Sequence, residues 1–167
     1  LDPAAPNLEG YLFPDTYRFP HGVSPARIAD TLVDGFRRQW LRAVKPTLAP
    51  DDRRPLRELV ILASLVEKEA KRAEERPLVA AVYANRLRRG IGLYADPTII
   101  YGLKLSGAWD GDLRRRDLET DGPWNSYLRP GLPPGPIASP GLASLLAAAR
   151  PADVDYLYFV SRNDGSH

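Results

Sequence analysis

The stretch RELVILASLVEKEAKRAEE, from Arg57 to Glu75, carries the clearest helical pattern in the chain. Each residue of a helix is rotated by about 100° from the one before it. One narrow apolar stripe then collects Leu59, Leu62, Val66 and Ala73, with Leu65 at its edge. Glu69 falls inside this stripe, whereas Glu67 points to the opposite side. The stretch therefore predicts a helix, running to about Arg72, with one acid on its apolar face.

The position of Glu69 makes it the first candidate for chemistry. An ionised carboxylate among apolar side chains is costly, so Glu69 is expected either to have a partner or to keep its proton near neutral pH. A carboxyl group that stays protonated is what general acid catalysis requires. The alternative is that the apolar stripe simply ends at this point and that Glu69 has no special role.

Composition narrows the class of protein. A length of 167 residues suits one domain, and no run of residues is long enough to span a bilayer. The net charge of +2, with no basic run interleaved with aromatics, does not favour nucleic acid as a partner. The absence of cysteine excludes disulfides and thiolate chemistry, and two histidines are too few for a His-rich metal site. We therefore expect no metal and no cofactor.

The order of elements predicts an α+β fold. Apolar spacing and capping residues indicate helices over residues 25–43 and 77–90, and between them a helix capped by Asp51 or Asp52 that runs to about Arg72. Shorter helical segments are expected over residues 98–103, 116–118 and 140–149. Strands are expected around Tyr11 and over Tyr156 to Ser161, the latter followed by the hairpin turn signal Asn163-Asp164-Gly165. The prediction is a helical centre with a small sheet made from these two strands.

One proline-rich segment is not expected to be a flexible linker. Residues 123–140 contain six prolines, but Trp124, Tyr127, Leu132 and Ile137 punctuate them, and these side chains prefer burial. We expect an ordered loop wrapped on the core, the kind of loop that carries function.

Several polar residues could join Glu69 in a site. Asp96, before Pro97, is a possible second carboxylate for glycoside hydrolysis, although a helix cap explains it equally simply. Asn125 and Tyr127 could hydrogen-bond to and stack on a sugar, or could serve turn geometry and the core. No Ser-His-Asp set, phosphate-binding glycine loop or metal-ligand spacing is present.

Six blocks in order resemble the catalytic domain of the YceG-like (MltG) family of endolytic murein transglycosylases. The blocks are EGYLFPDTYRF, LASLVEKEA, ERPLVAAVYANRL, ADPTIIYGL, NSYLRPGLPPGPIASPG and DYLYFV. The resemblance implies that Glu69, the second Glu of V-E-K-E, is the catalytic acid. It places the family's substrate-binding blocks on Asp96, Thr98, Tyr101, Asn125 and Tyr127. The chain departs from the usual pattern at Tyr94 and Ala95, where many members carry Gln, and at Trp124 and Ser126.

The resemblance also implies a function. It is cleavage of the β-1,4 bond between N-acetylmuramic acid and N-acetylglucosamine in peptidoglycan strands, with 1,6-anhydro ends as product. Two alternatives stay open, a non-catalytic peptidoglycan-binding module and a two-carboxylate hydrolase in which Asp96 activates water. Mass analysis of the product ends separates them.

The resemblance implies a setting for the parent protein as well. Family members resemble single-pass membrane proteins that face the cell wall on the outer side of the inner membrane, and cell-wall synthesis proteins are expected partners. Because the chain begins at Leu1 and lacks methionine, we expect a piece of a longer protein whose anchor is absent. Residues 1–8 are expected to be a linker remnant and residues 9–167 the catalytic domain, shortened at its C-terminus. Residues 9–45 are expected to join a LysM-like module.

Overall fold

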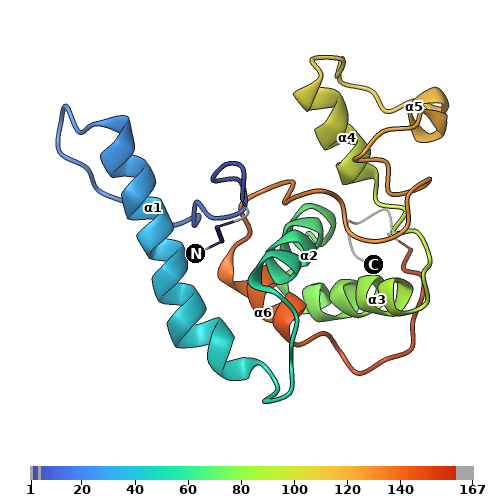
Figure 1. Cartoon of the computed structure of the whole chain (residues 1–167), viewed down its shortest axis with the longest axis horizontal. Helices are drawn as coiled ribbons and strands as arrows, with labels where there is room; N and C mark the ends of the chain where they lie inside the picture. The colour runs from blue at the N-terminus through green and yellow to red at the C-terminus, as the bar shows by residue number, and fades with distance from the viewer. Residues whose placement is uncertain (1, 4, 161–167) are drawn as a thin grey trace.

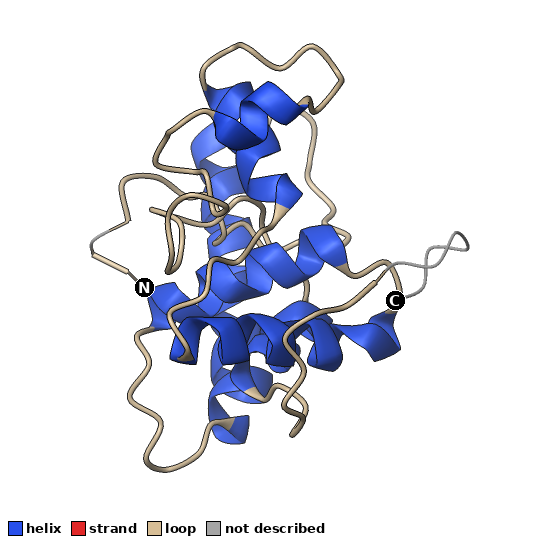
Figure 2. Ribbon diagram, turned by 90° about the vertical axis from the view of Figure 1, so that its right-hand side faces the viewer, coloured by secondary structure: helices blue, strands red, loops and turns tan. Residues whose placement is uncertain are grey.

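Every regular element in the described part of the chain is a helix. The computed structural model describes residues 2, 3 and 5–160 (Figures 1 and 2). The α-helices are α1 (Pro25–Gln39), α2 (Leu56–Glu69), α3 (Arg76–Arg88), α4 (Asp96–Leu105), α5 (Arg115–Glu119) and α6 (Leu142–Ala149). Short π- and 3-10-helical segments occur at Trp40–Val44, Lys45–Thr47 and Ala73–Glu75. None of these helices is long and apolar enough to cross a membrane.

The helices expected from the sequence are confirmed, apart from some of their ends. Ser24 caps α1 by accepting a hydrogen bond from the Arg27 amide at 3.3 Å, and Pro25 occupies the first position of the helix. Gly90, with φ of 66°, closes the turn after α3. The short helix expected over residues 98–103 is α4, which begins two residues earlier, at Asp96. Local capping and proline signals therefore predicted most of the helical boundaries.

Helix α2 lies at the centre of the molecule (Figure 1) and is more deeply buried than its sequence pattern predicts. All eight residues from Leu59 to Val66 are buried, so the helix is enclosed on every side over two turns. It packs against α6, α3 and α4. The narrow stripe expected from the spacing was an underestimate, because α6 and the proline-rich loop cover the faces that the pattern left polar or neutral.

The C-terminal end of α2 differs from the prediction. The helix ends at Glu69, and Ala70 adopts an extended conformation with φ of −81° and ψ of 114°. Ala73 belongs to a separate 3-10 turn, so it does not extend the stripe of α2. At the other end Pro55, not Asp51 or Asp52, precedes the first turn. Glu69 is thus the last helical residue, beside the negative end of the helix dipole.

The predicted α+β class is wrong for the described residues, because they contain no strand and no sheet (Figure 2). Around Tyr156 the chain is extended, and its side chains alternate between exposed and half-buried as a strand would. Its carbonyl groups, however, accept hydrogen bonds from side chains of α3. Asn85 donates to the carbonyls of Val154 and Tyr156, both at 2.8 Å. The predicted hairpin turn at residues 163–165 lies outside the described part.

The segment around Tyr11 is not a strand because it packs on a helix instead of pairing with a strand. Gly10 takes a φ of 87°, and the Tyr11 amide closes a turn by donating to the Leu8 carbonyl at 3.0 Å. Phe13 then donates its amide to the Leu32 carbonyl in α1. A Cβ on Gly10 would lie 2.6 Å from the Pro136 ring, so glycine is required by both conformation and space.

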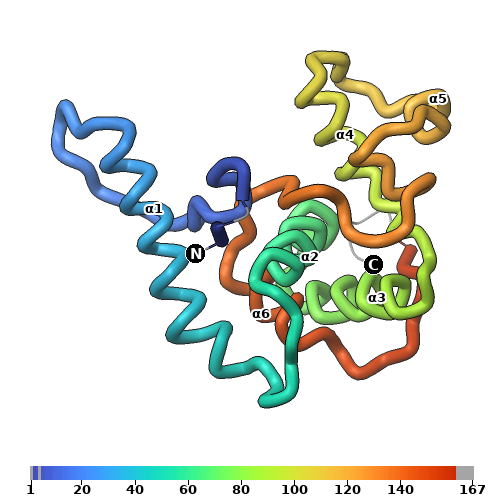
Figure 3. The backbone as a smooth tube through the Cα atoms, viewed as in Figure 1, coloured from blue at the N-terminus to red at the C-terminus, as the bar shows by residue number. Residues whose placement is uncertain are grey.

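The proline-rich loop is ordered on the core, as the sequence predicted. Figure 3 follows residues 123–141 across α2 toward α6. The Ile137 amide donates to the buried Ser64 hydroxyl at 3.0 Å, and Arg57 donates to the Pro134 carbonyl at 2.8 Å. Both partners belong to α2, so the central helix fixes the path of the loop.

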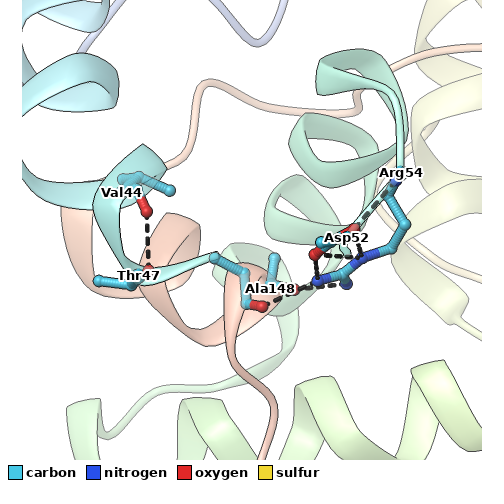
Figure 4. Close-up of polar contacts among 6 residues, drawn as sticks. Val44, Thr47, Asp52, Arg54 and Ala148 are labelled. Carbon is cyan, nitrogen blue, oxygen red and sulfur yellow. Dashed lines mark hydrogen bonds and ion pairs between the residues drawn. The ribbon is translucent and has the colours of Figure 1, made fainter. Parts of the chain in front are cut away.

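Arg54 ties the segment before α2 to the C-terminus of α6 (Figure 4). Its guanidinium group donates to the carbonyls of Ala148 at 3.0 Å and Ala149 at 2.8 Å. The Asp52 carboxylate accepts from the same group at 2.6 Å, and this hydrogen bond lowers the pKa of Asp52. Arg54 therefore supplies the donors that the last α6 carbonyls otherwise lack.

We expect Arg54→Ala to lower the free energy of unfolding by about 1–2 kcal/mol, because two α6 carbonyls and one carboxylate lose their donor. Urea unfolding followed by circular dichroism measures the change. Arg53→Ala, at an exposed neighbouring position, is the control and should leave the midpoint unchanged. Equal midpoints for the two variants would contradict a capping role for Arg54.

Candidate active site

The two acids of the V-E-K-E block have different surroundings. Glu67 is tied to α6, because its Oε2 atom accepts from the Ser144 hydroxyl at 2.6 Å and from the Gly141 amide at 3.1 Å. Arg76 completes the group by donating from Nε to the Ser144 hydroxyl at 3.0 Å. Gly141 precedes the first turn of α6, where a negative charge is favourable. Glu67 is therefore committed to holding α6 on α2.

Glu69 lies at the end of α2, half-buried, and faces a different group of side chains. Its charge raises the pKa of Tyr83 and the pKa of Tyr127, after the larger effect of burial on each. Residues 83 and 127 come from α3 and from the proline-rich loop. The fold thus brings three distant parts of the chain within electrostatic reach of one carboxyl group.

Asp96 and Tyr127 form a direct pair beside Glu69. The Tyr127 hydroxyl donates to Asp96 Oδ1 at 2.6 Å. Burial raises the pKa of Tyr127 most, and the hydrogen bond to Asp96 adds to the rise. Tyr127 therefore stays a neutral donor at physiological pH. Asp96 is the first residue of α4, so this pair also fixes the start of α4 against the proline-rich loop.

Arg86 of α3 holds the segments that border this group. It donates from Nε to the Leu157 carbonyl at 2.7 Å and from Nη1 to the Leu93 carbonyl. Its guanidinium group also lies 5.4 Å from the centre of the Tyr94 ring and 5.2 Å from that of Tyr158. Its positive charge opposes the rise in the pKa values of Tyr83 and Tyr127.

Tyr94 joins the group in a strained conformation. Its φ is 49°, and among the described residues other than glycine it alone has a positive φ. This left-handed conformation costs roughly 1 kcal/mol relative to the usual backbone conformations. Its ring is 43% exposed and lies 5.4 Å from the Tyr127 ring. A Cβ on Gly92 would lie 3.0 Å from the Ser126 carbonyl oxygen, so a larger residue at this position would crowd the proline-rich loop. The result is an aromatic pair beside Asp96, made of the exposed Tyr94 and the half-buried Tyr127.

Thr98 and Asn125 are buried supports of the same loops. The Thr98 hydroxyl donates to the Ala95 carbonyl at 2.8 Å and lies 2.9 Å from the Ser126 hydroxyl. Asn125 donates to the carbonyls of Leu118 and Thr120 and accepts from the Tyr127 amide at 2.9 Å. Asn125 therefore sets the conformation that presents Tyr127. It also lines a hollow of 480 Å³ between α4 and residues 117–125.

Tyr101 is not part of the group around Glu69. Its ring packs edge-on against Trp124, with centroids 4.6 Å apart, and it lines a hollow of 130 Å³ with Glu9 and Arg57. Arg57 lies in the first turn of α2 and Glu69 ends the helix, roughly 18 Å further along at the helical rise of 1.5 Å per residue. The structure thus brings Glu69, Asp96 and Tyr127 together, buries Thr98 and Asn125 beneath them, and places Tyr101 elsewhere.

Three members of the group were not among the site residues expected from the sequence. Tyr83 lies among the apolar positions of its helix, where an aromatic residue reads as core. Arg86 had no expected role beyond its place in the block ERPLVAAVYANRL, and Tyr94 was only a departure from the usual pattern. The burial of Arg86 and the positive φ of Tyr94 depend on tertiary contacts, so they could not be predicted from the sequence. Within residues 2, 3 and 5–160, no cluster of His, Cys, Asp or Glu could hold a metal ion.

Comparisons with known proteins agree on one family. The sequence profile of the YceG-like family matches residues 2–167. A protein of Bacillus subtilis (strain 168) named endolytic murein transglycosylase is 35% identical over 95% of this chain and 43% of its own length. A protein of Streptococcus pneumoniae (strain D39) with the same name is 35% identical over 92% of this chain and 28% of its own.

A solved structure has the same fold. A crystal structure of a YceG-like protein from Listeria monocytogenes superposes with a TM-score of 0.84 and 35% identity, over 95% of this chain and 50% of that one. The chain spans less than half the length of the curated relatives it matches. The profile match over almost the whole chain and the shared fold agree, and the chain belongs to the YceG-like family.

Proposed function

We propose that this domain cleaves the β-1,4 bond between N-acetylmuramic acid and N-acetylglucosamine within peptidoglycan strands and leaves 1,6-anhydro ends. The observation that carries the proposal is that Glu69 and Asp96 act on the same two tyrosines, Tyr83 and Tyr127, in a chain whose relatives are named endolytic murein transglycosylase. The names describe those relatives, and the geometry supports extending the activity to this chain.

Glu69 serves as acid and then as base in this proposal. Its protonated carboxyl group donates to the glycosidic oxygen, the bond from that oxygen to C1 of the muramoyl residue breaks, and N-acetylglucosamine leaves with a free 4-hydroxyl. The muramoyl C6 hydroxyl attacks C1 and gives its proton to the Glu69 carboxylate. No water is consumed, and the acid is regenerated. Glu69 is the last residue of α2, and the negative end of a helix dipole disfavours an early negative charge there, which supports its role as the acid.

The surrounding residues bind and orient the sugar. Tyr94 and Tyr127 present exposed and half-buried rings that suit stacking on a saccharide, and Asp96 holds the Tyr127 ring in place. Thr98 and Asn125 are buried and contribute indirectly, because their hydrogen bonds fix the conformation of the loop that carries Tyr127. Tyr101, at the other end of α2, would meet only a more distant unit of a long glycan.

Mass analysis of the ends released from purified glycan strands tests the proposal. We expect anhydro-muramoyl ends, which are one water lighter than the reducing ends that a hydrolase makes. Release of reducing ends would contradict the proposal and show that the domain is a hydrolase. Binding of strands without any new ends would reduce the domain to a glycan-binding module.

The Asp96→Asn variant addresses the two-carboxylate hydrolase directly. Because asparagine can still accept the Tyr127 hydrogen bond, we expect the rate to fall by less than about 10-fold, with anhydro ends unchanged. A hydrolase with Asp96 as its base would instead lose about 10²–10⁴-fold. Initial rates of strand cleavage, with Asp155→Asn at an exposed position as the control, distinguish the two results.

The proposed substrate also locates the reaction. Peptidoglycan lies outside the cytoplasm, so this domain would act on the cell-wall side of the membrane. We further propose that the parent protein is anchored there by a single segment and works beside cell-wall synthesis proteins. Labelling of the full-length protein from outside the membrane would test its placement.

A further inference from the structure

The hydroxyl group of Tyr83 is the one buried side-chain polar atom in the described residues that has no hydrogen-bond partner. The residue is 1% exposed, so water does not satisfy the hydroxyl from the surface. A buried hydroxyl without a partner destabilises a fold, and native structures hold few of them. Phenylalanine would fill the same space without this penalty, so the hydroxyl requires an explanation beyond packing.

The surroundings of this hydroxyl are charged on more than one side. Glu69 at the end of α2 and Asp96 at the start of α4 both act on it, with Glu69 the stronger. Arg86, on the same helix as Tyr83, opposes them, and Tyr127 adds to them from the proline-rich loop. The Phe159 ring covers Tyr83 edge-on, with centroids 6.0 Å apart. The hydroxyl is therefore enclosed by protein and unpaired, and it lies in the electric field of the Glu69 carboxyl group.

An enclosed donor of this kind can serve another side chain more readily than a substrate. We propose that Tyr83 is a positioning residue for Glu69, whose hydroxyl donates a hydrogen bond to the carboxylate that Glu69 carries after it has protonated the glycosidic oxygen. The inference rests on the proposed function, because only an acid that changes charge during the reaction needs such a donor. A tyrosine suits the role, since burial beside two carboxylates raises its pKa and keeps it protonated.

The proposed hydrogen bond has a defined place in the reaction. Before proton transfer the neutral carboxyl of Glu69 needs no extra donor, and the hydroxyl stays unpaired. After transfer the carboxylate turns toward Tyr83 and is held there until the muramoyl C6 hydroxyl returns a proton. Such an interaction is stronger in the charged state than in the ground state, so it accelerates the chemical step and does not tighten substrate binding.

The Tyr83→Phe variant of the whole chain tests this role. We expect kcat for release of anhydro ends to fall about 10- to 100-fold, the range for a hydrogen bond to a charged group, with KM unchanged. The melting temperature should stay the same or rise, because an unsatisfied hydroxyl has been removed. The alkaline limb of the pH–rate profile should move to higher pH, because the Glu69 carboxylate has lost a donor that favoured the ionised form.

Tyr17→Phe is the matched control. The Tyr17 hydroxyl is satisfied, since it donates to the Phe13 carbonyl at 3.0 Å, and it lies in the N-terminal segment before α1. Its removal should lower the melting temperature and leave kcat unchanged, the reverse of the pattern for Tyr83. Wild-type kcat and an unmoved pH profile in Tyr83→Phe would overturn the inference while the function stands. A wild-type chain that releases no anhydro ends would overturn the proposed function, and this role with it.

Discussion

Replacing Glu69 by glutamine is expected to lower the rate of glycan cleavage by about 10²–10⁴-fold and to leave the fold intact. Glutamine has nearly the shape of glutamate, but it cannot donate a proton to the glycosidic oxygen or recover one from the C6 hydroxyl. Glu69 ends α2 and is only half-buried, so the uncharged side chain should fit without disturbing the core. Initial rates on purified strands, with circular dichroism on the same samples, measure both effects.

Glu74→Gln is the control for this experiment. Glu74 is an exposed acid in the 3-10 turn that follows α2, five residues from Glu69, and its substitution should change neither rate nor fold. Cleavage by Glu69→Gln at the wild-type rate would remove Glu69 from the mechanism and leave Asp96 as the remaining carboxyl group of the site.

Replacing Glu67 by alanine is expected to lower the free energy of unfolding by about 2–3 kcal/mol. The Gly141 amide and the Ser144 hydroxyl lose a charged acceptor, and Arg76 loses the negative charge that lies 3.9 Å away. Because α6 is the main packing partner of α2, weakening this end should loosen the core. Chemical denaturation curves measure the change.

Comparing the Glu67 and Glu69 variants separates a structural acid from a catalytic one. Glu67→Ala should lose stability but keep kcat in the folded fraction, whereas Glu69→Gln should lose kcat but keep stability. Glu74→Ala, at the exposed position used for the earlier control, should leave the denaturation midpoint unchanged. A stable Glu67→Ala that has lost its activity would move the catalytic role to the first acid of the block.

The local pattern was a good guide to the helices. Capping residues and prolines act within a few residues of each other, so Ser24-Pro25 and Asp96-Pro97 predicted helix starts correctly. The spacing around Glu69 also separated it from Glu67, and the structure places these two acids in different surroundings. The assignment of Glu69 as the catalytic acid remains a prediction.

The sheet was predicted wrongly because strand pairing is not a local property. Alternation of exposed and half-buried residues around Tyr156 is present, but side chains of Asn85 and Arg86 bond to its backbone where a neighbouring strand was expected. Alternation alone shows that one face of an extended segment is covered, and it does not show by what.

By itself the sequence determined most of the helices and the family, because these depend on neighbouring residues and on ordered motifs. Only the tertiary structure decided what surrounds Glu69. Tyr83, Asp96 and Tyr127 lie far apart along the chain, and their approach to Glu69 depends on how α3, α4 and the proline-rich loop pack on α2. Packing of this kind is the sum of many long-range contacts, so no single stretch of residues encodes it.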